Sequence, residues 1–287
     1  MLGASIVSTF KNDAGYQVFS VSRQQRQNEK NNFTVDLTND NELFRKLRMI
    51  NPQIIVHCAA QVNVNACETE KEYCFNLHVN ATNNLVNYES VRTFIYVSTD
   101  AVFDGQRGNY TESDPVNPLN YYAFTKLKGE EVVVQANKVY AIIRTNLIGF
   151  KVPLQNSLFE WTFKSLKAGV PIKGFENVLF NPFYCPVLAQ RLLELLRINF
   201  VSGIYHFGSA DAISKFEFLQ KIAQAFNFPE ALITPEKLIN NAGSAVRPLN
   251  TTLNTEKIRS TGLMMPTMEQ NVNLLIKDFE QSVAYGK

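Results

Sequence analysis

The chain has 287 residues, of which 45% are hydrophobic and 19% are charged. Dividing by roughly 150 residues per domain predicts about two domains, and the composition is typical of a globular protein with a sizeable core. The 28 Lys and Arg residues nearly balance the 26 Asp and Glu residues, so the net charge is +2, which argues against a nucleic acid partner. The best apolar run, residues 54–60, is far shorter than the ~20 residues of a membrane-spanning helix. We therefore expect no membrane insertion.

The four cysteines show no paired short spacing of the kind that zinc sites or redox motifs use; they are Cys58, Cys67, Cys74 and Cys185. We therefore predict reduced thiols, no metal site and a cytoplasmic location. The N-terminal segment, Met1 to Lys11, has neither a basic leader nor a small-residue cleavage site, which argues against a signal peptide.

In the first half, strand-like and helix-like segments alternate along the chain. The expected strands are residues 17–22, 53–60, 93–98 and 139–143, and the expected helices are residues 43–50, 68–88 and 121–136. Nearly continuous apolar runs such as 53–60 suit strands that are buried on both faces. The alternation predicts an α/β fold with a doubly wound parallel sheet, which is the Rossmann arrangement.

The second half is less regular. Residues 156–168, 187–198 and 215–226 are expected to be helical, and residues 203–208 are expected to form a strand. We place a domain boundary near Gly149, which gives a first domain over residues 1–149 and a smaller C-terminal α/β domain over residues 150–287. Part of this second domain is expected to pack back on the sheet.

Tyr122 and Lys126 form the most informative local pattern. Residues four apart on a helix share one face, with a rise of roughly 6 Å between them. An ammonium at that distance favours the phenolate, so we expect a lowered pKa for Tyr122. A tyrosine of this kind can exchange a proton with a carbonyl or alcohol oxygen.

A second hydroxyl precedes this helix in the sequence. The expected strand at 93–98 is followed by Thr99 and Asp100, and ligands bind at the carboxyl ends of strands in open parallel sheets. Thr99 could therefore donate a hydrogen bond to the same carbonyl oxygen that Tyr122 protonates.

Taken together, these motifs resemble the extended short-chain dehydrogenase/reductase superfamily and, within it, the dTDP-4-dehydrorhamnose reductase family. The resemblance covers nearly the whole chain. Its motifs are 58–60, 63–68, 98–100, 102–105, 118–120 with Tyr122 and Lys126, 144–145, 247–250 and 253–254.

The resemblance implies a catalytic set in which Tyr122 is the general acid, Lys126 lowers its pKa and binds the nicotinamide ribose, and Thr99 orients the substrate carbonyl. It also implies that residues 1–149 bind the cofactor and residues 150–287 bind the substrate. The implied cofactor residues, besides Tyr122 and Lys126, are Gly3, Arg23, Asp36, Leu37, Ala59 and Ala60. The implied substrate residues are Thr99, Asp100, Arg247 and Asn250.

Arg23 bears on the choice of cofactor. It follows the expected strand 17–22, where NAD-specific folds place an acidic residue that holds the ribose 2′-hydroxyl. Ser22 and Arg23 instead supply a hydroxyl and a cation, which suit a 2′-phosphate. We therefore expect NADP(H) to be preferred, with NAD(H) as the alternative.

The N-terminal segment departs from the family pattern, in which a strand is followed by Gly-x-x-Gly-x-x-Gly. Gly3 matches only the last glycine, and residues 2–12 are expected to form the first helix. We therefore expect a sheet that lacks its opening strand and has two unpaired edges, and we interpret Met1 as an internal methionine of a longer protein. The helix N-terminus would still attract the cofactor diphosphate.

Two functions follow from these resemblances. The first is an NADP(H)-dependent oxidoreductase that reduces a nucleotide-linked 4-keto-6-deoxy sugar, as in dTDP-L-rhamnose biosynthesis, with a homodimer as its assembly. The alternative is a non-catalytic regulatory β-type subunit of methionine adenosyltransferase, whose partner would be the catalytic subunit. The chain resembles that subunit at residues 56–60, 102–105 and 221–227.

Overall fold

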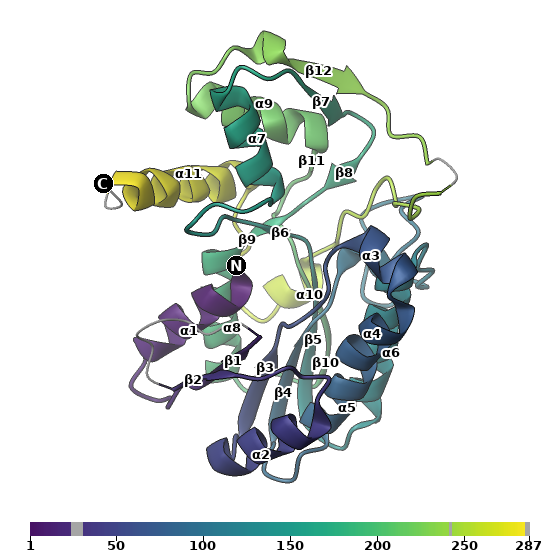
Figure 1. The fold of residues 1–287 in the computed structure, drawn as a ribbon, viewed down its shortest axis with the longest axis vertical. Helices are drawn as coiled ribbons and strands as arrows, with labels where there is room; N and C mark the ends of the chain where they lie inside the picture. The colour runs from purple at the N-terminus through teal and green to yellow at the C-terminus, as the bar shows by residue number, and fades with distance from the viewer. Residues whose placement is uncertain (24–30, 241–242, 285–287) are drawn as a thin grey trace.

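A sheet of four parallel strands, ordered β10-β5-β4-β3, forms the centre of the lower half of the molecule as drawn in Figure 1. Its strands are β3 (Ile54–His57), β4 (Thr93–Val97), β5 (Val139–Thr145) and β10 (Gly203–Phe207). The computed structural model describes residues 1–23, 31–240 and 243–284. The expected α/β fold with a parallel sheet is confirmed.

Helices cover both faces of this sheet, because its strands carry apolar side chains on both sides. Along β4, Ile95 and Val97 face one helical layer, and Phe94 and Tyr96 face the other. The first layer contains α1 (Leu2–Lys11) and α8 (Cys185–Arg197), and the second contains α2 (Asp40–Ile50), α5 (Ala81–Val86) and α6 (Tyr121–Gln135). The sheet is therefore doubly wound.

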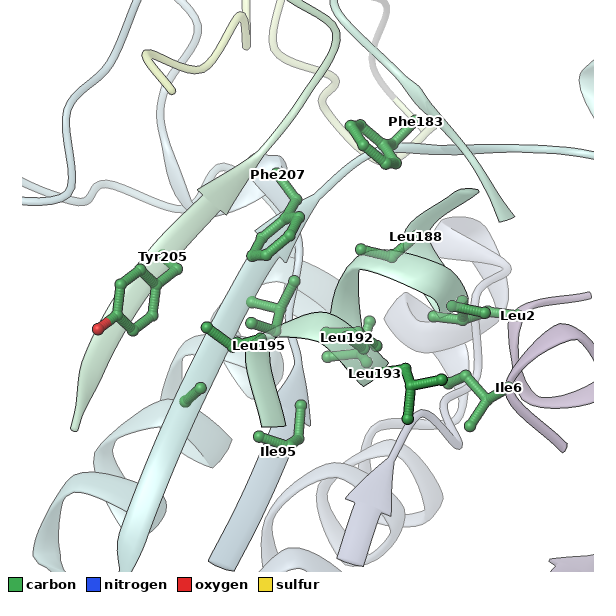
Figure 2. Close-up of a cluster of buried hydrophobic side chains, with 14 of the residues drawn as sticks. Leu2, Ile6, Ile95, Phe183, Leu188, Leu192, Leu193, Leu195, Tyr205 and Phe207 are labelled. Atoms are coloured by element: carbon green, nitrogen blue, oxygen red, sulfur yellow. The ribbon is translucent and has the colours of Figure 1, made fainter. Parts of the chain in front are cut away.

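The layer formed by α1 and α8 is shown in Figure 2, where leucines of α8 lie between Leu2 and Ile6 of α1 and the aromatic residues of β10. Both α1 residues are buried. Burying a side chain of this size stabilises the fold by about 1.5–3 kcal/mol. The N-terminal helix is thus held by its apolar face against α8, in the core that α8 shares with the sheet.

Two further strands, β1 (Ser20–Ser22) and β2 (Asn32–Thr34), pair with each other in parallel and form a separate small sheet. Within the described residues, β3 pairs only with β4 and β1 pairs only with β2. Each of these two strands therefore has one edge without a strand neighbour in the described part of the chain.

The expectation of one continuous helix over 68–88 is wrong. The segment is divided into α3 (Val64–Thr69), α4 (Lys71–Phe75), a π-helical turn η1 (Asn76–Asn80) and α5. The break lies at Glu70, whose backbone leaves the helical region with φ −108° and ψ 48°. The π-helical turn adds a second irregularity directly after α4.

The second half combines short strands with α8 and three further long helices, α7 (Leu158–Lys167), α9 (Lys215–Ala225) and α11 (Met268–Ala284). The remaining elements are η2 (Asp100–Val102), β6 (Leu147–Ile148), β7 (Ile172–Phe175), β8 (Leu179–Phe180), β9 (Phe183–Tyr184), β11 (Ile213–Ser214), η3 (Glu230–Leu232), β12 (Ile233–Glu236) and α10 (Glu256–Arg259). Strand β10 pairs with β5, so this part of the second half joins the central sheet. The boundary at residue 149 stays a prediction.

A separate core, rich in phenylalanine, holds α7, α9 and α11 together. The rings of Phe159, Phe163 and Phe279 lie within 4.6–6.2 Å of one another, centroid to centroid.

Among the described helices, none is long and apolar enough to cross a bilayer.

Candidate active site

Thr99 and Asp100 lie directly after β4, at the carboxyl end of the sheet. The Thr99 side chain accepts a hydrogen bond from the amide of Ala101 at 3.2 Å and so caps the short helix η2. Its hydroxyl donates to Oδ1 of Asp100 at 3.2 Å. Both side chains are buried, and this position is the one that the sequence predicts.

The Asp100 carboxylate links three segments of the chain. It accepts hydrogen bonds from Asn146 Nδ2 at 3.0 Å and from Thr251 Oγ1 at 2.5 Å, in addition to the bond from Thr99. Burial raises the pKa of Asp100, and these donors act in the opposite direction. The carboxylate thus connects the ends of β4 and β5 to the C-terminal segment.

Helix α6 presents Tyr122 and Lys126 from its first two turns. Asn120 caps the helix, because its side chain accepts from the amide of Ala123 at 2.9 Å while its Nδ2 donates to the carbonyl of Val246 at 2.9 Å. The N-terminus of α6 is therefore fixed to the C-terminal segment.

Tyr122 lies beside Thr99. Burial raises the pKa of Tyr122 to about 12, although the neighbouring Thr99 hydroxyl acts to lower it. The expectation of a lowered pKa for Tyr122 is wrong for this structure, because removal of the phenol from water outweighs the other effects. The phenol therefore keeps its proton at neutral pH.

Lys126 is only 2% exposed. Its ammonium donates to the carbonyl of Val97 at 2.8 Å and lies 3.9 Å from the ring centroid of Tyr96. Burial lowers the pKa of Lys126 to about 7, with Glu130 acting in the opposite direction. The amine thus lies at the carboxyl end of β4. At neutral pH it is close to its pKa, so both its charged and its neutral form are populated.

A buried ion pair next to this site was not predicted from the sequence. Arg144 of β5 and Glu130 of α6 are 2.7 Å apart, and each side chain is 3% exposed. Ser98 also donates to Glu130 at 2.5 Å. The sequence signals were that residues 144–145 belong to the family motifs and that Glu130 follows Lys126 by one helical turn. The pair joins α6 to the ends of β4 and β5.

His78 in the π-helical turn connects α6 to the loop that follows β3. Its Nε2 accepts from the amide of Gln61 at 2.9 Å, and its Nδ1 lies 2.8 Å from Thr125 Oγ1. Its ring meets that of Tyr122 edge-on, with centroids 5.9 Å apart. Burial lowers the pKa of His78 to about 3, so the imidazole is neutral.

The predicted cofactor residues fall into two groups. In the first, Gly3 in α1 lies against Cys58, since a Cβ at position 3 would be 3.2 Å from the cysteine sulfur. Ala59 and Ala60 follow Cys58 at the end of β3 and are half-buried. The start of α1 therefore lies at the carboxyl end of β3, where a helix N-terminus favours an anion.

The second group lies at the ends of β1 and β2 and is more exposed. The Arg23 guanidinium donates to the Tyr73 hydroxyl and lies 5.7 Å from that ring's centroid. Asp36 accepts two hydrogen bonds from Thr38, which lower the pKa of Asp36, and Arg23 contributes to this lowering. Leu37 packs at the margin of the nearby core. Arg23 and Asp36 are thus brought together.

The two predicted substrate residues of the C-terminal segment, Arg247 and Asn250, lie in different surroundings. Arg247 is exposed and lines a cavity of about 360 Å³ together with Asn65 and Ile239. The Asn250 side chain bonds instead to the loop before Tyr110, through the carbonyl of Arg107 at 3.3 Å, and to Thr252 at 2.9 Å. Its contacts therefore indicate a role in holding that loop.

Lys215 was not anticipated from the sequence. It begins α9 directly after the capping residue Ser214, and its ammonium lies 3.4 Å from the ring centroid of Phe180. Burial lowers the pKa of Lys215 to about 8, and Asp100 acts in the opposite direction. A second cation therefore lies near Asp100.

Among the described residues, no group of three His, Cys, Asp or Glu side chains is arranged to hold a metal ion.

Comparison with known proteins places this site in a family. The family model described as the RmlD substrate binding domain matches residues 1–281. A crystal structure of dTDP-4-dehydrorhamnose reductase from Bacillus anthracis in complex with NADP is 26% identical, covers 86% of this chain and 88% of that chain, and has a TM-score of 0.78.

Two curated relatives have different names. The probable low-salt glycan biosynthesis reductase Agl14 of Haloferax volcanii is 27% identical over 290 residues, which is 96% of this chain and 94% of the relative. The methionine adenosyltransferase 2 subunit beta of Danio rerio is 29% identical over 226 residues, which is 76% of this chain and 69% of the relative. Since the family model covers nearly the whole sequence, the chain belongs to the RmlD substrate binding domain family.

Proposed function

We propose that this protein is an NADP(H)-dependent reductase of a nucleotide-linked 4-keto-6-deoxy sugar. The observation that carries the proposal is that two hydroxyls, those of Thr99 and Tyr122, lie beside each other at the carboxyl end of β4, with the buried amine of Lys126 one helical turn further along α6. A dTDP-4-dehydrorhamnose reductase with a similar fold binds NADP.

The residues fit a nicotinamide cofactor at both of its ends. Lys126 and Tyr122 would hold the nicotinamide ribose. The N-terminus of α1, with Gly3, and the loop at Ala59 would bind the diphosphate. Arg23 would bind a 2′-phosphate. When bound, the cofactor supplies a hydride to the keto carbon.

The protein residues supply the proton and the orientation. Because burial raises the pKa of Tyr122 to about 12, the phenol is protonated at neutral pH and can donate to the oxygen of the reduced carbonyl. The Thr99 hydroxyl, which donates to Asp100 in this structure, would donate to the same oxygen when the substrate is bound. A charged Lys126 then stabilises the phenolate that remains after donation.

The test is NADPH oxidation with dTDP-4-dehydrorhamnose by the intact chain and by Tyr122→Phe. We expect turnover to fall by about 10²–10⁴-fold, because the general acid is removed. Tyr121→Phe is the matched control, since Tyr121 is the preceding residue on the same helix and its ring contacts Lys71 instead. Equal turnover in the wild-type and Tyr122→Phe proteins would refute the assignment.

A second candidate function is supported by the relative from Danio rerio, which is a methionine adenosyltransferase subunit. In that case the chain would bind a methionine adenosyltransferase catalytic subunit. Copurification of the two proteins, combined with an absence of NADPH-dependent turnover, would favour this candidate over the reductase.

A further inference from the structure

The sulfur atoms of Cys67 and Cys74 lie 2.9 Å apart. Both side chains are fully buried. This pair is absent from the proposed reaction, and the seven-residue spacing does not match a redox motif in the sequence.

The break between α3 and α4 explains why these two thiols meet. In one continuous helix, residues seven apart are separated by about 10.5 Å along the axis. The non-helical backbone at Glu70 ends α3 and starts α4, which bends the chain so that Cys67 and Cys74 face one another. The sulfurs need to approach by about 0.9 Å more to reach the ~2.05 Å of a disulfide bond.

The thiol pair lies where three parts of the candidate site join. Cys67 donates from its sulfur to the carbonyl of Gln61 at 3.5 Å, in the loop after β3. The next residue, Glu68, accepts from the amide of Tyr121 at 2.8 Å, at the first turn of α6. A movement of α3 would therefore act on both the loop and the helix that carries Tyr122.

We propose that Cys67 and Cys74 form a dithiol that a peroxide oxidises reversibly to a disulfide, and that closure of this bond shifts α3 and the N-terminus of α6. One thiolate attacks the peroxide, which gives a sulfenic acid and one water molecule when the oxidant is hydrogen peroxide. The second thiol displaces the sulfenic oxygen as a second water molecule. The two sulfurs lose two electrons and two protons, and the peroxide is reduced to water.

Burial sets the rate of this reaction. It raises the pKa of both Cys67 and Cys74, and the thiolate is the reactive form. Helices α3 and α4 have only six and five residues, so they depend on packing and open locally more readily than a long helix. Oxidation therefore proceeds through brief opening of this segment.

The first experiment counts thiols in the full chain after treatment with hydrogen peroxide. The protein is unfolded, its free thiols are alkylated, and its mass and peptides are measured. We expect the number of free thiols to fall from four to two, with one peptide pair linked through Cys67 and Cys74, and to return to four with dithiothreitol. Sub-denaturing urea should accelerate the reaction.

The matched variants separate this pair from the other cysteines. Cys185→Ala should still lose two thiols, and Cys67→Ser with Cys74→Ser should form no disulfide. Four free thiols after peroxide treatment in sub-denaturing urea would overturn the proposal. A linkage that involves Cys58 or Cys185 would overturn it as well.

The second experiment tests the shift of α6 without an activity assay. Hydrogen exchange of the amides at the start of α6, including Tyr121, should be faster in the oxidised protein, because the bond to Glu68 is weakened. If the reductase is active, a displacement of about 1 Å should also reduce turnover by up to about 100-fold. Unchanged exchange in the disulfide form would overturn the proposed coupling, whatever the reaction of this protein is.

Discussion

The two ends of the candidate cofactor site differ in how they are built. At the end near Tyr122, the side chains of Lys126, Glu130 and Arg144 are almost completely buried. At the other end, Arg23 is exposed and contacts Tyr73 at the surface. Burying a charge without a partner raises the free energy of the folded state, whereas two exposed charges interact only weakly with each other. The first end therefore has a fixed geometry and shifted pKa values, whereas the second can change with little effect on the fold.

The largest effect is expected from Glu130→Ala, which leaves Arg144 buried without its partner. Breaking a buried pair in this way should lower the free energy of unfolding by about 3–5 kcal/mol. The control is Glu131→Ala, the next residue, whose exposed pair with Lys128 should contribute no more than about 1 kcal/mol. Urea unfolding of both variants measures the difference, and equal losses would contradict the comparison.

The pH dependence of the reductase should report Lys126. Its pKa is lowered to about 7, so the amine is charged below this pH and neutral above it. Because the charge stabilises the Tyr122 phenolate, kcat/KM should fall by about tenfold for each pH unit above 7. Lys126→Arg keeps its charge and should abolish this decline. A flat profile for the unmodified protein would contradict the assignment.

Acid should destabilise the protein through its buried histidines. Burial lowers the pKa values of His57, His78 and His206 to about 3, while in the unfolded chain they remain near 6.5. The unfolded state therefore binds more protons between these values, so stability is greatest above pH 6.5 and is lost as the pH falls.

Each histidine adds up to about 1.4 kcal/mol per pH unit to this loss. Urea unfolding at pH 5 and pH 7 measures the slope, and His206→Gln should reduce it. An unchanged slope in that variant would mean that other groups cause the acid sensitivity.

The smallest effect is expected at the exposed end. Arg23→Ala should weaken NADPH binding by about tenfold, which corresponds to ~1.4 kcal/mol, and should leave NADH binding and the unfolding free energy unchanged. Arg48→Ala, at the exposed end of α2, is the control. Fluorescence titration with both cofactors measures this, and an equal loss for NADH would rule out a 2′-phosphate contact.

The site could be predicted from sequence where it depends on periodic elements. The strand before Thr99 is a clear apolar run, and both this strand and the helix with Tyr122 and Lys126 lie where the sequence predicts them. The pKa of Tyr122 was not predictable, because it depends on how much water the folded protein removes from the phenol. Lys215 was also missed, since its proximity to Asp100 arises from packing between distant segments.

The strands of the second half were harder to predict from the sequence, because they are short and depend on distant segments. Strands β6, β8 and β9 have two residues each, which is too short for a two-residue alternation to be recognised. Their pairing depends on neighbours far along the chain. The break at Glu70 has no turn residue that would identify it in the sequence, so a continuous helix was the simplest expectation.

The π-helical turn at Asn76–Asn80 has a consequence for how this segment tolerates changes in length. A π-helical turn holds one residue more than an α-helical turn, so the removal of one residue could restore a regular helix. Because the deleted residue would be the one that the wider turn accommodates, α4 and α5 would keep nearly their present orientation. A single-residue deletion here would therefore act mainly within the turn, at His78, which joins the loop after β3 to helix α6.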